Sequence, residues 1–129
     1  MIAHVQTTDG LVVVDLDEEV IVEVDSSSEI ETAPQPQLSL PLVVAAAVSG
    51  STIVAVVGTK PPLVVSHDSG RTWRESGRGL PAGRAIAISP DDPDVVLYAT
   101  RNRLYLSRDG GRFWQGIALE LPEIEAVSL

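Results

Sequence analysis

Residues 66–73 read SHDSGRTW and residues 107–114 read SRDGGRFW, and these two octapeptides decide the architecture. They share serine, aspartate, glycine, arginine and tryptophan at the same positions and lie 41 residues apart. Leu-Pro pairs at 40–41, 80–81 and 121–122 recur at almost the same interval, as do Ala-Val-Ser or Ala-Ile-Ser triplets at 47–49, 87–89 and 126–128. A shared period of this length predicts repeated copies of one structural unit.

Each period divides into four short strands. The best copy predicts strands over residues 85–89, 95–100, 103–107 and 113–117, and the copy before it predicts 43–49, 52–59, 63–66 and 72–75. Valine, isoleucine, tyrosine and tryptophan fill these segments, whereas glycine, proline, aspartate and asparagine fill the gaps. No segment has an apolar period of about 3.6 residues. The sequence therefore predicts an all-β chain of four-stranded antiparallel units.

The first 25 residues form a degenerate copy, with strands predicted over 2–7, 11–15 and 20–24. Residues 15–19 stand where the octapeptide should be, with Glu19 at the glycine position and Val22 at the tryptophan position. This copy lacks a first strand, whereas residues 123–129 supply a first strand that lacks its other three. The sum is twelve strands, or three units of four.

The octapeptides resemble the Asp box, Ser-x-Asp-x-Gly-x-Thr-Trp, with Phe113 in the threonine position of the second copy. The run over residues 88–100 also resembles the segment that precedes such a box. Residues 40–129 are thus similar to the Asp-box (BNR repeat) β-propellers, which include sialidases, the sortilin ectodomain, xyloglucan-cleaving glycosidases and photosystem II assembly factors. The resemblance implies propeller blades but no activity, because the box is not catalytic in these families. Its structural positions are Ser66, Asp68, Gly70, Trp73, Ser107, Asp109, Gly111 and Trp114.

The box residues have a physical role in the turn between the third and fourth strands. Glycine permits a positive φ there, and an aspartate side chain can accept hydrogen bonds from turn amides. We therefore expect Asp68 and Asp109 to lock the hairpins. We expect Trp73 and Trp114 to lie between adjacent sheets as large apolar contacts whose indole N–H still finds an acceptor.

Three blades form only an arc, because propellers usually close with 4 to 8 blades. An open arc exposes blade faces and unpaired edges, which favour association. Two copies related by a twofold axis give six blades and leave no open face. We therefore predict a homodimer with C-terminal strand exchange, and a nine-bladed trimer is the alternative. The predicted division is residues 1–25 for blade 1, 26–41 for a loop, 42–75 for blade 2, 76–117 for blade 3, and 118–129 for the strand that completes blade 1 of the partner.

Charge and composition exclude several classes of protein. Eighteen acids against nine bases give a net charge of −9, which disfavours nucleic acid and anionic membranes as partners. The absence of cysteine excludes disulfides, Cys-ligated zinc and thiol nucleophiles. The N-terminus has no basic region before an apolar run, so we expect a cytoplasmic protein. The uncharged residues 32–59 fit two strands around a small-residue turn better than a membrane span.

One face of the predicted propeller carries the candidate ligand site. Loops that join fourth to first strands and second to third strands share this face, which usually bears the binding site in related proteins. Lys60, Arg78, Arg84 and Arg101 fall in these loops and suggest a site for an anion or an acidic peptide. We favour the alternative that these charges serve solubility and the attraction of a basic third blade to the acidic first blade. We expect Arg84 and Glu123, at equivalent strand starts, to line the channel mouth without binding a ligand.

The sequence gives little support for enzyme chemistry. A sialidase needs three substrate-binding arginines and a tyrosine nucleophile, but Tyr98 and Tyr105 lie within strands of one blade and the Arg-Ile-Pro hallmark is missing. The carboxylates over residues 91–94 lie too close together in one turn for the pair that a glycosidase requires. His4 and His67 have no neighbours that indicate a metal site or a triad.

We therefore expect no catalytic residue, no metal and no cofactor. A non-enzymatic protein-binding or scaffold module is the favoured function, and the sequence does not identify its ligand. An oligomeric lectin that binds carbohydrate is the alternative, and a glycosidase-like or sialidase-like hydrolase is less favoured. Aromatic residues for sugar stacking are scarce, since phenylalanine, tryptophan and tyrosine make up 4% of the chain.

Overall fold

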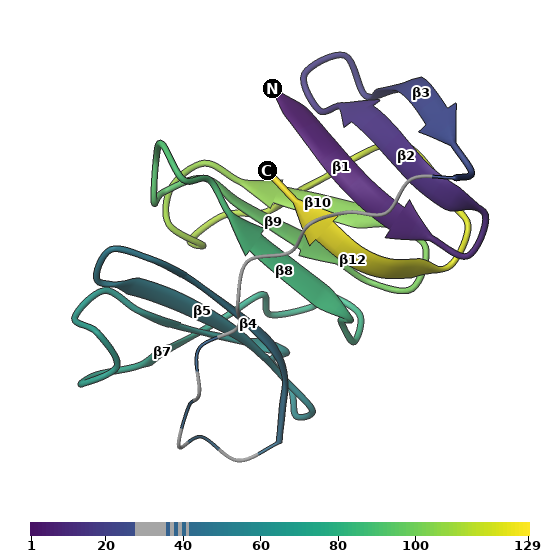
Figure 1. Cartoon of the computed structure of the whole chain (residues 1–129). Coiled ribbons are helices and arrows are strands. Elements are labelled where there is room, and N and C mark those ends of the chain that lie inside the picture. Colours follow the sequence, from purple (N-terminus) through teal and green to yellow (C-terminus); the bar gives the residue numbers. More distant parts are fainter. Residues whose placement is uncertain (28–35, 37, 39, 41) are drawn as a thin grey trace.

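The computed structural model describes residues 1–27, 36, 38, 40 and 42–129. This part of the chain forms twelve strands in three four-stranded antiparallel sheets, which lie side by side (Figure 1). The all-β prediction and its three units of four strands are confirmed. Most of the expected loop over residues 26–41 lies outside the described residues.

Sheet 1 combines both ends of the chain. Its order is β12-β1-β2-β3, with β1 at Ile2–Thr7, β2 at Gly10–Asp15, β3 at Val20–Asp25 and β12 at Ile124–Ser128. Sheet 2 has the order β4-β5-β6-β7, with β4 at Val43–Ser49, β5 at Thr52–Val57, β6 at Leu63–Ser66 and β7 at Arg74–Ser76. Sheet 3 has the order β8-β9-β10-β11, with β8 at Ala85–Ile88, β9 at Val96–Ala99, β10 at Leu104–Ser107 and β11 at Gln115–Gly116.

The fourth strands of sheets 2 and 3 begin later than the sequence suggested. β7 starts at Arg74 instead of residue 72, and β11 starts at Gln115 instead of residue 113. The amides of Thr72 and Phe113 donate hydrogen bonds to aspartate carboxylates of the preceding turns. Because these amides are held by the turn, the sheet ladder begins only after them.

In the structure the C-terminal strand pairs within its own chain, in contrast to the predicted exchange between subunits. β12 pairs with β1 of the same chain, in a register that places His4 opposite Ser128 and Val5 opposite Val127 (Figure 1). The segment that leads into β12 stays beside sheet 3, since the Ile124 amide donates to the Arg101 carbonyl over 2.8 Å. The last strand therefore runs past β8 and completes the first sheet of its own chain.

The sheets also stand in a different order from the chain. One buried cluster joins sheet 1 to sheet 3, and a second joins sheet 2 to sheet 3, so sheet 3 is in the middle. Sheets 1 and 2 are therefore separated by sheet 3, although their strands β3 and β4 are consecutive along the chain. An ion pair between Arg108 Nη2 and Asp17 Oδ1, 2.7 Å apart, also connects sheet 3 to sheet 1.

The central position of sheet 3 explains the unbroken apolar run of β9. All four residues of β9 are buried. Val96 and Tyr98 belong to the cluster with sheet 2, and Leu97 and Ala99 belong to the cluster with sheet 1. A strand covered on both faces needs apolar side chains at every position, whereas a strand covered on one face alternates buried apolar residues with exposed ones. β1 alternates in this way, because only every second residue faces sheet 3.

Tyr98 fills the contact between sheets 2 and 3. Its side chain is fully buried, and its hydroxyl donates a 2.6 Å hydrogen bond to the Pro81 carbonyl. The ring meets that of Trp114 edge to face, with centroids 6.0 Å apart. A Cβ atom at Gly83 would lie 2.1 Å from the Tyr98 ring, so only glycine fits at that position.

The Gly83→Ala substitution should therefore displace Tyr98 and destabilise the chain by about 1–3 kcal/mol, the usual cost of overpacking a core. Gly58→Ala is the matched control, since a Cβ there meets no atom closer than 3.6 Å. Urea unfolding of both variants measures the difference. Equal stability of the two variants would show that the Tyr98 pocket yields easily.

A cysteine pair tests the pairing of β12 with β1. Directly opposed Cα atoms in antiparallel strands lie about 4.5–5.5 Å apart, within the range of a disulfide. The chain has no cysteine of its own, so His4→Cys combined with Ser128→Cys should oxidise to a cross-linked single chain. Non-reducing electrophoresis should show a band at the mass of one chain, with the two single variants as controls. A reducible band at twice that mass, specific to the double variant, would indicate exchange instead.

Candidate functional site

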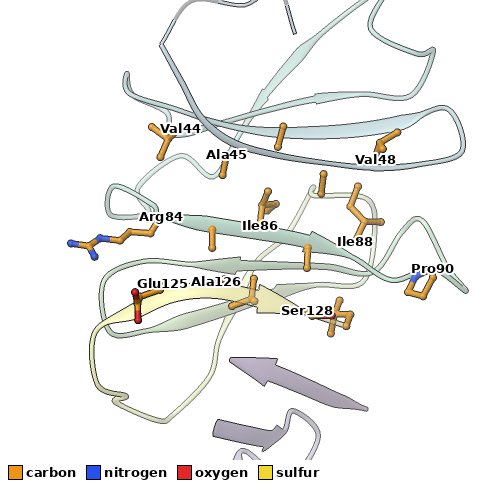
Figure 2. Close-up of a pocket in the computed structure, with 16 residues that line it drawn as sticks. Val44, Ala45, Val48, Arg84, Ile86, Ile88, Pro90, Glu125, Ala126 and Ser128 are labelled. Carbon is orange, nitrogen blue, oxygen red and sulfur yellow. The ribbon is translucent and has the colours of Figure 1, made fainter. Parts of the chain in front are cut away.

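A groove of about 420 Å³ runs along the innermost strands of the three sheets, β4, β8 and β12. We call it the central trough. Figure 2 shows its lining, with Val44, Arg84 and Glu125 at one end and Val48, Ile88 and Ser128 at the other. The side chains along it are mostly small, which leaves the space open. The alanines among them are Ala45, Ala46, Ala47, Ala85, Ala87 and Ala126.

Charged side chains gather at the Arg84 end of the central trough. Arg84 Nη2 lies 2.8 Å from Glu123 Oε1, and Arg101 Nε lies 3.6 Å from the same oxygen. One carboxylate thus faces two guanidinium groups, and Glu125 at the same end of the trough balances the remaining positive charge. The three ion-paired side chains are partly exposed, and exposed ion pairs contribute little to stability because water screens them. Their arrangement therefore suits a ligand-facing surface better than a structural lock.

The structure brings together two of the four basic residues that the sequence singled out. Arg84 and Arg101 share Glu123. Lys60 and Arg78 lie in the β5–β6 and β7–β8 loops at the same end of the sheets. Within the described residues, neither makes an ion pair, and Arg78 lines a different groove. The four residues therefore do not form one compact site.

The trough itself was not predicted as a site. Its signal in the sequence is the repeated alanine at the first strand of each unit, which sets small side chains against the centre of the arc. Glu125, which lines the same end as Arg84, also went unnoticed among the acids of the C-terminal segment. Small residues lie there because three inner strands converge, and that convergence is a tertiary property.

Both octapeptides form turns locked by an aspartate. Asp68 Oδ1 accepts hydrogen bonds from Ser66 Oγ at 2.8 Å and from the Thr72 amide at 2.9 Å, and Asp68 Oδ2 accepts one from Thr72 Oγ1 at 2.6 Å. Asp109 Oδ1 accepts from Ser107 Oγ at 2.8 Å and from the Phe113 amide at 3.0 Å. These bonds are those of the expected hairpin locks.

The bonds also shift the acidity of the two carboxyls. The Thr72 hydroxyl and amide, with Ser66, lower the pKa of Asp68 to about 2. The Phe113 amide and the Ser107 hydroxyl lower the pKa of Asp109 as well. Each carboxylate is thus held in its charged form by donors of its own turn.

The two tryptophans differ although their octapeptides match. Trp114 packs between sheets 3 and 2, and its Nε1 donates to Ser76 Oγ over 3.0 Å. Trp73 lies on the outer side of sheet 2, and its Nε1 donates to the Gly70 carbonyl of its own turn over 3.1 Å. Within one chain, Trp114 lies between two sheets as expected, whereas Trp73 has no second sheet over it among the described residues. The reason is the order of the sheets, since nothing in the described chain follows sheet 2 on that side.

The remaining candidates offer no reactive constellation in the described part of the chain. Burial raises the pKa of Tyr98, whose hydroxyl is already bonded to Pro81. Among the residues described, no three histidine, aspartate or glutamate side chains come together as a metal site. No helix in this part has the length and hydropathy that a membrane crossing requires.

Comparison with known proteins supports the architecture. No family model and no curated protein matches the chain. Among solved structures, the chain is similar to the crystal structure of the GH74 enzyme of Niastella koreensis, with 23% identity and a TM-score of 0.50. The match covers 92% of this chain and 17% of that protein, so the chain spans about a sixth of its length. GH74 enzymes are a β-propeller family, and the similarity therefore supports a propeller-like fold.

The aspartate locks predict a pH dependence of stability. A pKa lowered from 3.8 to about 2 means that the stabilisation by Asp68 is complete above pH 4–5 and is lost as the pH falls toward 2. Asp68→Asn should therefore lower the melting temperature at pH 7, and its difference from the wild type should shrink between pH 4 and pH 2.

Thermal unfolding at pH 7, 4 and 2 measures this difference. Asp91→Asn is the matched control, because its carboxylate accepts no hydrogen bond in the described structure and the substitution should change little at any of these pH values. A difference between Asp68→Asn and the wild type that stays constant down to pH 2 would contradict the role of the charged carboxylate.

Proposed function

We propose that the chain is a non-enzymatic binding or scaffold module that supplies three blades of an Asp-box β-propeller, and that two copies close a six-bladed ring as a homodimer. The hydrogen bonds of Asp68 and Asp109 support the Asp-box resemblance. One observation carries the proposal of a ring: at Val48 and Trp73, the outer face of sheet 2 repeats the face with which sheet 3 packs on sheet 2, although Ala55 stands at the position of Tyr98.

The strand registers make this repetition explicit. Ile88 pairs with Val96 in sheet 3, and Val48 pairs with Ile53 in sheet 2 at the corresponding position. Ile88 packs into the cluster between sheets 3 and 2, whereas Val48 is 48% exposed. Trp73 corresponds in the same way to Trp114. Sheet 2 therefore presents a face of the kind that packs on a preceding blade, although no sheet of the described chain covers it.

Sheet 1 offers the complementary face at the other end of the arc. Leu63 and Val65 of sheet 2 pack against sheet 3. On strand β2, Val12 and Val14 pack against sheet 3, so Leu11 and Val13, which alternate with them, point away from sheet 3. Sheet 1 of one copy can thus receive sheet 2 of a second copy, and a twofold axis makes the contact twice. Because β12 already completes sheet 1 within each chain, this ring needs no exchange of strands.

The ring would join two central troughs into one channel with two-fold symmetry. The cluster of Arg84, Arg101 and Glu123 would then occur twice at the mouth of the channel, with Lys60 and Arg78 on the same face. Such a face supports the binding of an anionic group on a protein partner through charge complementarity. A lectin remains the competing function, and binding of neutral glycans on an array would favour it over the protein-binding module.

Val48→Lys tests the ring. A lysine in the interface would leave a charge desolvated, so the dimer of about 27 kDa, twice the 13.7 kDa chain, should dissociate. Val24→Lys is the matched control, because Val24 is similarly exposed, at 58%, but pairs with Val12 on the side of sheet 1 that faces sheet 3. Light scattering after size exclusion gives the masses.

The masses also decide among the alternatives. We expect the wild type and Val24→Lys at the dimer mass, and Val48→Lys at the mass of one chain. A wild-type particle of 13.7 kDa would overturn the ring. A particle of three chains would replace six blades by nine.

A further inference from the structure

A second groove, of about 320 Å³, lies between sheets 2 and 3 on their outer side. One wall is the edge strand β7 with the residues that follow it, and the other is the octapeptide turn of sheet 3. Arg74 and Arg78 come from the first wall, and Arg112, Phe113 and Trp114 come from the second. We call it the arginine groove.

Basic side chains without a carboxylate partner gather in this groove. Of the nine lysines and arginines, four pair with a carboxylate: Arg84, Arg101, Arg103 and Arg108. The other five have no such partner among the described residues, and three of these five line the arginine groove. Glu75 is the single acid in its lining. A chain with a net charge of −9 thus holds a local cationic site, where a bound anion would find guanidinium groups not already neutralised.

The floor of the arginine groove is fixed by bonds between the two sheets. Trp114 Nε1 donates to Ser76 Oγ over 3.0 Å, and Ser76 Oγ in turn donates to the Gly111 carbonyl. Arg74 Nη2 donates to the Gly110 carbonyl over 3.3 Å. The two walls are therefore held at one separation, which reduces the entropy cost of ordering the site when a ligand binds.

Aromatic side chains accompany the arginines. Phe113 is 79% exposed, and it replaces the threonine that binds the aspartate in the other octapeptide. A large apolar side chain exposed to this degree, next to guanidinium groups, favours a ligand that has both carboxylates and an apolar or aromatic group. The groove runs beside β7, whose outer edge has no neighbouring strand within the described sheet, and an extended peptide fits such an edge.

We propose that the arginine groove binds an extended acidic peptide segment of another protein, with carboxylates paired to Arg78 and Arg112 and an aromatic side chain packed on Phe113. The groove is formed within one chain. The inference therefore stands independently of the six-bladed ring, and a failure of one leaves the other testable.

Fluorescence anisotropy with a fluorescein-labelled peptide, Glu-Glu-Phe-Glu-Glu, measures binding to the full chain at low salt. Arg112→Gln and Arg78→Gln should each raise the Kd about tenfold, the usual effect of losing a charge-assisted hydrogen bond. Arg71→Gln is the matched control, since Arg71 occupies the same octapeptide position as Arg112 but lies outside the groove. It removes the same charge and should leave the Kd nearly unchanged.

Two further probes separate a peptide site from a general anion site. Gln-Gln-Phe-Gln-Gln should bind about a hundredfold more weakly than the acidic peptide, and Glu-Glu-Ala-Glu-Glu several-fold more weakly. Equal weakening by Arg71→Gln and Arg112→Gln would overturn the proposal in favour of diffuse surface charge. Equal binding of the Phe and Ala peptides, with displacement by inorganic phosphate, would overturn it in favour of a simple anion site.

Discussion

Sheet 3 is covered on both faces, and the positions of the other two sheets depend on this packing. β9 buries Val96 and Tyr98 against sheet 2 and Leu97 and Ala99 against sheet 1, so it has no face that water can reach. Burial of apolar surface contributes about 25 cal/mol per Å², so both contacts stabilise the described chain. Sheets 1 and 2 each have only one face covered in this way, and their outer faces are the surfaces that remain for association.

Both candidate binding sites lie at seams between these sheets. The return of β12 to sheet 1 carries Glu123 to Arg84 and Arg101, and the packing of sheet 3 on sheet 2 sets the second octapeptide beside β7. A turn that stabilises its own hairpin thereby becomes the wall of a groove. Trp114 and Trp73 illustrate the same effect, because matching octapeptides give one buried bridge between sheets and one tryptophan bonded only to its own turn.

The sequence-based prediction of the site succeeded only where local structure decides position. The aspartate locks follow from the octapeptides alone, since every donor to Asp68 and Asp109 lies within four residues of it in the chain. The four basic residues were placed on one face by loop order, and that order cannot tell which side chains meet. Arg84 and Arg101 both pair with Glu123. Arg78 instead lines another groove, together with Arg74 and Arg112.

The amino-acid sequence by itself determined the twelve strands, their grouping into three antiparallel sheets and the two locked turns. Alternating and continuous apolar runs, turn residues and the repeated octapeptide all act over a few residues, so they can be read without the fold. Only the tertiary structure decided that β12 pairs with β1 of its own chain and that sheet 3 lies between sheets 1 and 2. This strand pairing and this order of sheets depend on contacts between segments far apart in the chain. The apolar faces of the three sheets have similar compositions, so the sequence alone does not tell which face packs on which.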